Sequence, residues 1–186
     1  MALFYLIRHG QPDYSGCDER KYKGHGRDLA PLSEKGIEQV IETSKDARLK
    51  DAQLIVCSPY TRAMQTASII SKQLSIDIKV EMDLHEWMPD LTFTYDNLDE
   101  CLELTNDYNK CHGEYPKDEE KRWESLSHLR NRVRAVADKY ASYDKVIIVG
   151  HGMALKTLTY IEHMTPAEIV ECTYELNQPN CIVSFT

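Results

Sequence analysis

The sequence lacks the features that mark secreted, membrane-bound and nucleic-acid-binding proteins. No basic segment followed by a long apolar run begins the chain, so we expect no signal peptide. The longest apolar run near the C-terminal end, residues 146–149, is far too short to span a membrane. The net charge of -8 argues against a nucleic-acid partner, because such proteins present a basic surface. We therefore expect a cytoplasmic protein with no membrane or nucleic-acid partner and assign it no oligomeric state.

The sequence also lacks the usual signatures of a metal or cofactor site. Its six cysteines include no CxxC pair, and Cys111-His112 has no two further ligands at a spacing that zinc uses. We expect these thiols to be reduced, as in other cytosolic proteins. Neither a Walker glycine loop for a nucleotide nor a carboxylate cluster for magnesium is present. The chain is therefore expected to work with neither a metal nor a cofactor.

What is present is the composition of a globular domain. The 186 residues are 42% hydrophobic and 28% charged, which is enough to build a sizeable core. No repeats, linkers or low-complexity segments interrupt the chain, so we predict one domain over residues 1–186. Apolar strand-like runs alternate with amphipathic helical segments. This alternation predicts an α/β fold with a mostly parallel central sheet flanked by helices.

The expected elements follow from the periodicity of the apolar residues. We predict strands at residues 3–7, 53–57, 76–80 and 145–149, and helices over 33 to about 50, from 58 onward, over 123–140 and over 153–161. Ser33 is the expected N-cap of the first helix, with Ile37, Val40 and Ile41 buried. Ser58 before Pro59 predicts the start of the second helix. Residues 173–176 and 181–185 are expected to form a hairpin at the sheet edge.

Two long segments fall outside this alternation. Residues 11–31 are polar and predict a long loop, in which Arg20, Lys21, Lys23 and Arg27 concentrate positive charge. These cations are either solvated or turned toward a substrate. Residues 88–120 are acidic and irregular, with one possible short helix. We predict that this second segment is an insertion or lid that covers one side of the domain.

Basic or imidazole side chains follow three of the predicted strands. These positions are Arg8-His9-Gly10, Ser58-Pro59 with Arg62, and Gly150-His151-Gly152. The carboxyl ends of parallel strands share one edge of a sheet, where the ligand crevice of an α/β fold lies. Each residue alone is also compatible with a surface position, but the repeated pattern favours a site. We therefore expect two arginines and two histidines to converge there.

These four side chains suit the transfer of a phosphoryl group. Arginine binds tetrahedral oxyanions with two donors and keeps its charge, and histidine can act as a nucleophile. Phosphoryl transfer depends mainly on positioning and on charge near the equatorial oxygens, so the four residues can act without a metal. The leaving alkoxide also needs a proton donor. Glu86, just past the third predicted strand, is the candidate, and an ordinary exposed glutamate is the alternative.

At this level of detail the sequence resembles the histidine phosphatase superfamily, which includes the cofactor-dependent phosphoglycerate mutases. The segments that carry the resemblance are, in order, Arg8-His9-Gly10, residues 31–36 (PLSEKG) with Gln39, residues 58–67 (SPYTRAMQTA), residues 84–86 (LHE) and residues 150–152 (GHG). The resemblance implies a phosphoglycerate mutase-like three-layer sandwich with His9 as the phosphohistidine nucleophile. It also implies Arg8, Arg62 and His151 as phosphate ligands and Glu86 as the proton donor.

The sequence departs from the family pattern directly after the first motif. Many members carry an asparagine there that touches the phosphate, whereas residues 11–16 (QPDYSG) contain none. Ser15 or backbone amides are the candidate replacements, and Lys21 of the basic loop is a candidate substrate-binding residue. The chain is also shorter than the mutases of the family, which have larger insertions around their substrate. This difference favours a phosphatase.

We therefore predict a metal-independent phosphatase that hydrolyses a small-molecule phosphomonoester through a phosphohistidine on His9. The first alternative is a phosphotransferase of the phosphoglycerate mutase type. The second is a non-catalytic domain that binds phosphoproteins or acts as a scaffold, which would be expected to have lost His9, His151 or Glu86, and the sequence keeps all three. Sugar phosphates, phosphorylated cofactor precursors and phosphoproteins all remain open as substrates.

Overall fold

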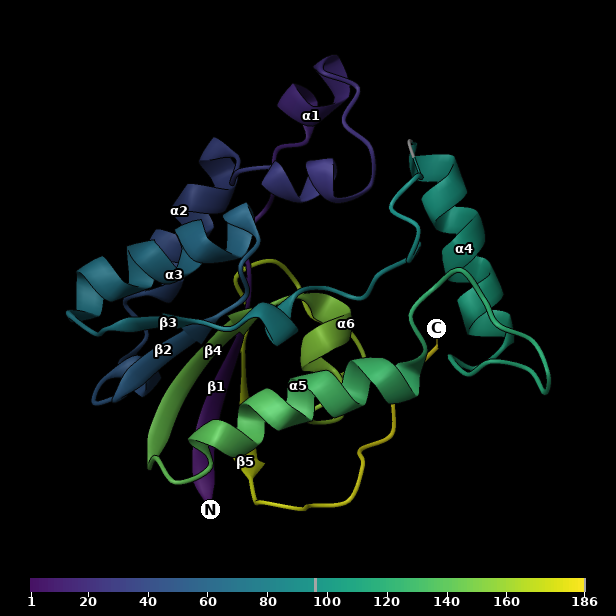
Figure 1. Cartoon of the computed structure of the whole chain (residues 1–186). Helices are drawn as coiled ribbons and strands as arrows, with labels where there is room; N and C mark the ends of the chain where they lie inside the picture. Colours follow the sequence, from purple (N-terminus) through teal and green to yellow (C-terminus); the bar gives the residue numbers. More distant parts are fainter. Residues whose placement is uncertain (96, 186) are drawn as a thin grey trace.

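A five-stranded sheet lies at the centre of the computed structural model, which describes residues 1–95 and 97–185 (Figure 1). The strand order is β3-β2-β4-β1-β5. The parallel strands are β1 (Ala2–Arg8), β2 (Leu54–Cys57), β3 (Ile78–Val80) and β4 (Lys145–Gly150), and β5 (Ile169–Tyr174) pairs antiparallel with β1. The predicted α/β fold with a mostly parallel sheet is confirmed.

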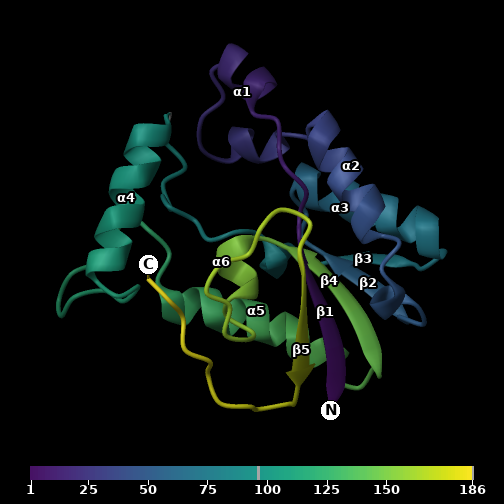
Figure 2. The same cartoon turned by 180° about the vertical axis from the view of Figure 1, so that it is seen from behind.

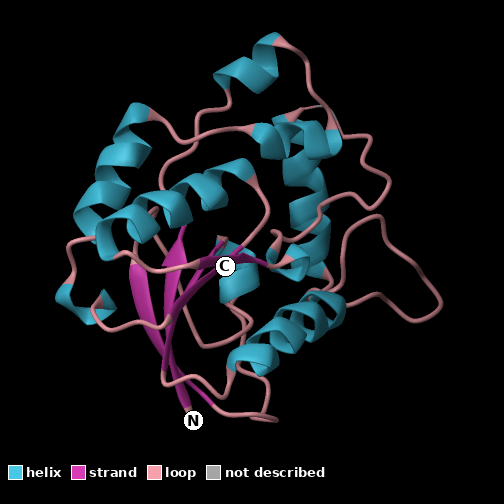
Figure 3. Ribbon diagram, turned by 60° about the vertical axis from the view of Figure 1, so that its left-hand side comes forward, coloured by secondary structure: helices cyan, strands magenta, loops and turns pink. Residues whose placement is uncertain are grey.

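Helices cover both faces of this sheet and give three layers (Figures 2 and 3). The α-helices are α1 (Ser15–Glu19), α2 (Glu34–Thr43), α3 (Thr61–Leu74), α4 (Leu98–Lys110), α5 (Leu126–Tyr140) and α6 (Gly152–Leu155), with 3-10 helices at Gly24–Leu29, Ala47–Leu49 and Met82–Leu84. The pair α2 and α3 covers one face, and α5 and α6 cover the other. Across the described ranges, no helix has both the length and the apolar character needed to cross a membrane.

The side chains of the central strands alternate between the two faces and divide the core. On β1, Phe4 and Leu6 pack with α5 and α6, whereas Tyr5 and Ile7 pack with α2 and α3. The strands β2 and β4 alternate in the same way. Because both faces are covered, the central strands appear in the sequence as uninterrupted apolar runs.

Helix α2 begins as predicted but faces the core differently. The side chain of Ser33 accepts a hydrogen bond from the Gly36 amide at 3.0 Å, which confirms the N-cap. The expected buried face was wrong in part, because Val40 is buried but Ile37 and Ile41 are 39% and 44% exposed. The helix contacts the turn after β1 along Gly36, where a Cβ atom would lie 2.1 Å from the Gln11 carbonyl oxygen. This close approach turns both isoleucines outward.

The predicted ends of several helices were also wrong. Helix α2 ends at Thr43 instead of continuing to about residue 50, and a 3-10 turn follows. The next helix, α3, begins at Thr61 with Tyr60 as its N-cap, so Ser58 is not the cap. Helices α5 and α6 are shorter than the expected 123–140 and 153–161.

The predicted C-terminal hairpin was wrong. The edge strand β5 begins earlier, at Ile169, and pairs along the length of β1 from Ile7 to Ala2. Residues 181–185 form no strand. Two arginines of α5 form hydrogen bonds with the chain near its C-terminus. Arg130 donates to the Cys181 carbonyl at 2.8 Å, and Arg134 donates to Asn180 Oδ1 at 2.5 Å. A side chain of α5 therefore binds the Cys181 carbonyl, a backbone group that a hairpin partner would otherwise bind.

The acidic segment 88–120 contains α4, which is longer than the short helix expected there. The ring of Tyr108 on α4 lies 4.8 Å from the Trp87 ring and 5.1 Å from the Trp123 ring, which fastens α4 to the chain before and after it. Figures 1 and 2 both show α4 and α1 beyond the same end of the sheet. The assignment of the segment as an insertion or lid stays a prediction.

Candidate active site

Three neighbouring strands end where the candidate residues lie. In the sheet, β4 lies between β1 and β2, with Arg8 opposite Gly150 and Cys57 opposite Val149. The next residues continue this pairing, because the His9 amide donates to the Gly150 carbonyl at 3.0 Å. The rings of His9 and His151 are 5.0 Å apart between their centroids. The structure therefore brings the two predicted histidines together at one edge of the sheet.

His9 is buried and held in one tautomer by its own turn. Its Nδ1 lies 2.7 Å from the Gly10 carbonyl oxygen, an acceptor, so Nδ1 carries the proton. The lone pair of Nε2 is then free to accept, and Arg62 Nε lies 3.3 Å away. Burial, followed by the nearby positive charge of Arg62, lowers the pKa of His9 to about 3. A neutral imidazole with an unprotonated Nε2 is the form that can act as a nucleophile.

Arg62 lies in the first turn of α3, so it reaches the site from a helix and not from the end of a strand. Its side chain is 5% exposed, and its two terminal nitrogens lie 3.2 and 3.3 Å from Asp28 Oδ1. The guanidinium also lies 5.0 Å from the centre of the Tyr60 ring. A carboxylate therefore occupies donors that match the oxygens of a phosphate.

His151 and Arg8 each present a buried nitrogen with no partner in the described part of the chain. The first is Nδ1 of His151, whose Nε2 lies 2.7 Å from Ser58 Oγ. The second is Nε of Arg8, whose Nη1 donates to the Met164 carbonyl at 2.5 Å. Burial, followed by the charge of Arg62, lowers the pKa of His151 well below its usual range. Arg8 ends β1 and His151 follows the adjacent strand β4, and both nitrogens are suited to a bound oxyanion.

Glu86 lies against the start of α6, directly after His151. Its Oε1 accepts from the amides of Trp87 at 2.8 Å and Ala154 at 3.1 Å, and Oε2 accepts from the Met153 amide at 3.3 Å. The predicted proton donor therefore lies beside the histidine site and is not an isolated surface glutamate.

A buried arginine on α5 supports the backbone around Glu86. Arg132 donates to the carbonyls of Asp83, His85 and Glu86 at 2.7, 2.8 and 3.0 Å. It also forms two hydrogen bonds with the buried carboxylate of Glu124, at 2.7 and 2.8 Å. This pair fixes the turn that carries Glu86.

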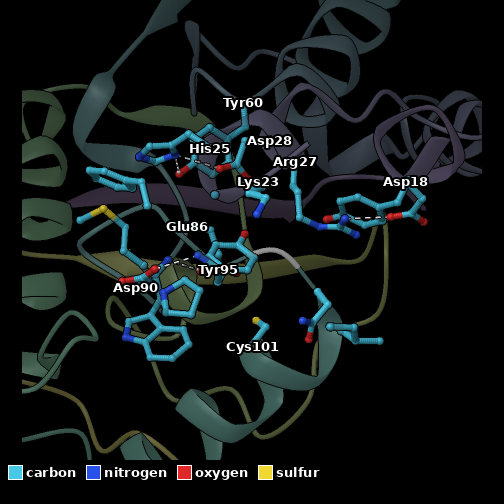
Figure 4. A pocket seen from close by; sticks show the side chains of 18 of the residues that line it. Asp18, Lys23, His25, Arg27, Asp28, Tyr60, Glu86, Asp90, Tyr95 and Cys101 are labelled. Atoms are coloured by element: carbon cyan, nitrogen blue, oxygen red, sulfur yellow. Dashed lines mark hydrogen bonds and ion pairs between the residues drawn. The ribbon is translucent and has the colours of Figure 1, made fainter. Parts of the chain in front are cut away.

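A cavity of about 900 Å³ opens from the site, and both Arg62 and Glu86 line it. Figure 4 shows Asp28, Tyr60, Glu86 and Tyr95 around it. Its walls come from residues 14–28, from residues 60–62, and from residues 86–101. The cavity therefore adjoins the candidate site.

The two remaining candidates differ in position. Lys21 lines the cavity and adopts a backbone φ of 54°. Ser15 is exposed, its amide donates to Asp13 Oδ1 at 2.9 Å, and it does not line the cavity. The structure therefore brings Lys21, but not Ser15, next to the candidate site.

Sequence reasoning missed Asp28, Ser58 and Arg132 as parts of the site. Ser58 was interpreted as a helix cap, and Asp28 belonged to a loop of many charged residues. Arg132 did carry a signal, because it stands among the apolar positions of α5 that include Leu129 and Val133. A charged residue on an apolar helix face is unusual unless it is paired.

The arrangement places a cationic donor next to a neutral imidazole, and a carboxyl group lies against the start of α6, which directly follows His151. No group of three or more His, Cys, Asp or Glu residues that could hold a metal ion occurs within residues 1–95 and 97–185. Arg8 and Arg62 place positive charge close to His9 and His151. This arrangement can bind a tetrahedral oxyanion, attack it from His9 and supply a proton from Glu86.

Comparisons with known proteins point to one family. Residues 4–185 match the family model of the histidine phosphatase superfamily (branch 1). The chain is 28% identical over 169 residues to "Uncharacterized phosphatase PhoE" of Bacillus subtilis (strain 168), covering 85% of this chain and 76% of that protein. It is 26% identical over 167 residues to "Probable phosphoglycerate mutase GpmB" of Escherichia coli O1:K1 / APEC, covering 85% and 73%.

The fold is likewise similar to that of a solved phosphoglycerate mutase from Bacillus anthracis str. Sterne. The TM-score is 0.65 at 20% identity, with 91% of this chain and 86% of that chain covered. At this identity the likeness concerns the fold alone. It agrees with the three-layer arrangement of helices around the mostly parallel sheet.

Proposed function

Because the chain belongs to the histidine phosphatase superfamily (branch 1), we propose that it hydrolyses small phosphomonoesters through a phosphohistidine on His9. The observation that carries this proposal is the state of His9. Its Nδ1 is 2.7 Å from the Gly10 carbonyl, and its unprotonated Nε2 is 3.3 Å from Arg62 Nε. A nucleophilic nitrogen thus lies next to a cation that would bind the electrophile.

In the first step the Nε2 lone pair of His9 attacks phosphorus, and the bond from phosphorus to the leaving oxygen breaks. Glu86 gives its proton to that oxygen, so an alcohol departs and Glu86 becomes a carboxylate. The Gly10 carbonyl keeps its hydrogen bond from Nδ1 and stabilises the positive charge that forms on the ring. The product of this step is a phosphohistidine.

In the second step a water molecule attacks the phosphohistidine. The Glu86 carboxylate takes one proton from that water, and the P–N bond breaks to return its electron pair to Nε2. Inorganic phosphate leaves, and both His9 and Glu86 regain their starting protonation states. Arg8, Arg62 and His151 are proposed to hold the phosphoryl oxygens through both steps and to replace a metal ion.

Trapping the intermediate tests the proposal. Acid-labile, base-stable phosphate should appear on wild-type protein quenched during turnover of p-nitrophenyl phosphate, and His9→Ala should not form it. His9→Ala should also lose several orders of magnitude in kcat/KM while remaining folded. His163→Ala, which removes an exposed histidine outside the cavity, is the matched control. A His9→Ala protein that keeps a tenth of the activity would contradict the assignment.

A phosphoglycerate mutase-type phosphotransferase is the second candidate. The likeness to the Escherichia coli relative, named as a probable phosphoglycerate mutase, favours it. The two functions separate in one assay with 3-phosphoglycerate, in which free phosphate and the isomerised phosphoglycerate are followed together. A hydrolase releases phosphate, and a mutase accumulates the isomer.

A further inference from the structure

Aromatic and imidazole rings form part of each wall of the cavity beside the candidate site. Its volume of about 900 Å³ is large among sites for small molecules and far exceeds the space that a phosphate needs. Six of its lining side chains carry rings with a flat face: Tyr14, His25, Tyr60, Trp87, Phe93 and Tyr95. They come from three separate segments of the chain. Flat ring faces favour another ring over a flexible polyol, because stacked or edge-to-face contacts add to the burial of apolar area.

Phe93 is held in a conformation that a bulky residue rarely adopts. Its φ is +58°, its side chain is 45% exposed, and its ring lies 4.2 Å from the His25 ring. Strained backbone of this kind persists only where the surroundings fix it, and it is concentrated at binding sites. Phe93 lines the cavity, so the contacts that fix its backbone also fix where its ring meets the cavity.

The loop that carries Phe93 is built around the buried carboxylate of Asp90. That carboxylate accepts from the amides of Thr92, Thr94 and Tyr95 at 2.9, 2.8 and 2.9 Å. Arg122 forms an ion pair with it at 3.0 Å. These contacts fix residues 90–95 before any ligand binds, so the ring of Phe93 is pre-organised.

The opposite wall of the cavity is fastened to the same loop. The Gly24 amide donates to the Tyr95 carbonyl at 2.8 Å. A Cβ atom on Gly24 would lie 2.3 Å from the Phe93 carbonyl oxygen, and its φ of +48° also favours glycine. The basic loop and the Phe93 loop therefore meet backbone to backbone, and the spacing between their rings is set.

Carboxylates of the cavity already pair with two of its arginines. The described lining residues include four cations and four acidic side chains, one of which is the proposed proton donor Glu86. Arg27 is paired with Asp18 at 2.8 Å, and Arg62 is paired with Asp28 at 3.2 Å. Because Asp28 contacts the arginine assigned to the phosphate, an anionic group next to the phosphoryl group would meet a carboxylate.

Resting on the proposed function, we propose that the substrate is a phosphomonoester whose leaving group carries a ring and no anionic group of its own. The phosphoryl group lies at Arg62, and the ring packs in the cavity against Phe93 and the neighbouring aromatic side chains. Asp28 disfavours substrates with a carboxylate or second phosphate close to the reacting phosphorus. Phosphoglycerates belong to this disfavoured class.

Three esters test the inference by phosphate release from the full-length protein. The first two, 2-phenylethyl phosphate and propyl phosphate, both lose a primary alkoxide, so they differ mainly in the ring. Burial of the ring should raise kcat/KM for 2-phenylethyl phosphate about 10- to 100-fold over propyl phosphate, mostly through KM. The third, 3-phosphoglycerate, should be a poorer substrate than propyl phosphate.

Replacing Phe93 tests whether the preference for the ring-bearing ester arises in the cavity. Phe93→Ala should reduce the preference for 2-phenylethyl over propyl phosphate about three- to tenfold, because one ring contact is lost. Tyr160→Ala, which removes an exposed ring that does not line the cavity, should leave the preference unchanged.

The failure of this inference is distinct from failure of the proposed function. Equal kcat/KM for the two alkyl phosphates, or fastest release from 3-phosphoglycerate, would overturn the inference while the hydrolase assignment stands. An unchanged preference in Phe93→Ala would also overturn it. If none of these esters, nor p-nitrophenyl phosphate, releases phosphate, the proposed function falls and the inference falls with it.

Discussion

Replacing Glu86 by glutamine separates its proposed chemical role from its structural one. Glutamine has nearly the same size as glutamate but cannot give a proton to a leaving oxygen. In one amide orientation it keeps the acceptor that receives the hydrogen bonds of Trp87 and Ala154 at 2.8 and 3.1 Å. Only the longer contact, at 3.3 Å from the Met153 amide, is lost.

The magnitudes of the two effects differ enough to be told apart. Loss of one such hydrogen bond costs about 1 kcal/mol of stability. Loss of general acid catalysis costs about 10²- to 10⁴-fold in rate, which corresponds to about 3–5 kcal/mol in the activation free energy. We therefore expect Glu86→Gln to fold normally and to fail in the step that needs the proton.

The assay compares two leaving groups in the same variant. Propyl phosphate releases a strongly basic alkoxide that needs a proton, whereas p-nitrophenolate departs readily without one. Glu86→Gln should therefore lose about 10²- to 10⁴-fold in kcat/KM on propyl phosphate and much less on p-nitrophenyl phosphate. Glu162→Gln, at an exposed position outside the cavity, should behave like the wild type on both.

Equal losses on both substrates would refute this reasoning. Glu86 would then only position the site through its contacts with the start of α6, and the acid would have to be another group. If His151 were that acid, the same dependence on the leaving group would appear in His151→Asn instead.

Three further predictions follow from the site. EDTA should leave the rate unchanged and vanadate should inhibit strongly, because side chains are proposed to supply the charge; activity lost on chelation and restored by zinc or magnesium would contradict this. Asp28→Asn should lower the inhibition constant of inorganic phosphate about three- to tenfold, because a charged competitor for Arg62 is removed; an unchanged or raised constant would refute that competition. The pKa of His9 is about 3 in the folded protein and 6.5 in the unfolded chain. Between these two pH values the unfolded chain binds more protons, so up to about 5 kcal/mol of stability is lost as pH falls from 6.5 to 3. Urea unfolding of His9→Asn should therefore depend less on pH than unfolding of the wild type, and equal dependence would disprove this contribution.

The sequence alone was sufficient to place His9, Arg62 and His151 near one another. His9 and His151 come within two residues of a short apolar run, and Arg62 lies in the helix after another such run; these runs predict buried strands. Alternation of strands and helices makes the sheet mostly parallel, and parallel strands end at one edge. The apolar runs, their alternation with helices and the shared edge of parallel strands therefore predicted the position of the candidate site.

Local rules also predicted the Ser33 cap, but they could not settle which face of α2 is buried. The spacing of Ile37, Val40 and Ile41 fits an apolar stripe, yet the approach of Gly36 to Gln11 rotates that stripe away from the core. The spacing of apolar residues shows that a helix has an apolar stripe. Contacts with the neighbouring backbone decide whether that stripe faces the core.

Only the tertiary structure decided the partners of the polar residues. Ser58 contacts His151 across 93 positions of sequence, Arg62 contacts Asp28 across 34, and Arg132 supports the Glu86 carbonyl across 46. A buried polar group must find a hydrogen-bond partner, but many side chains of the right chemistry could serve. The packed fold selects among them, because only the atoms it brings within about 3 Å can form the bond.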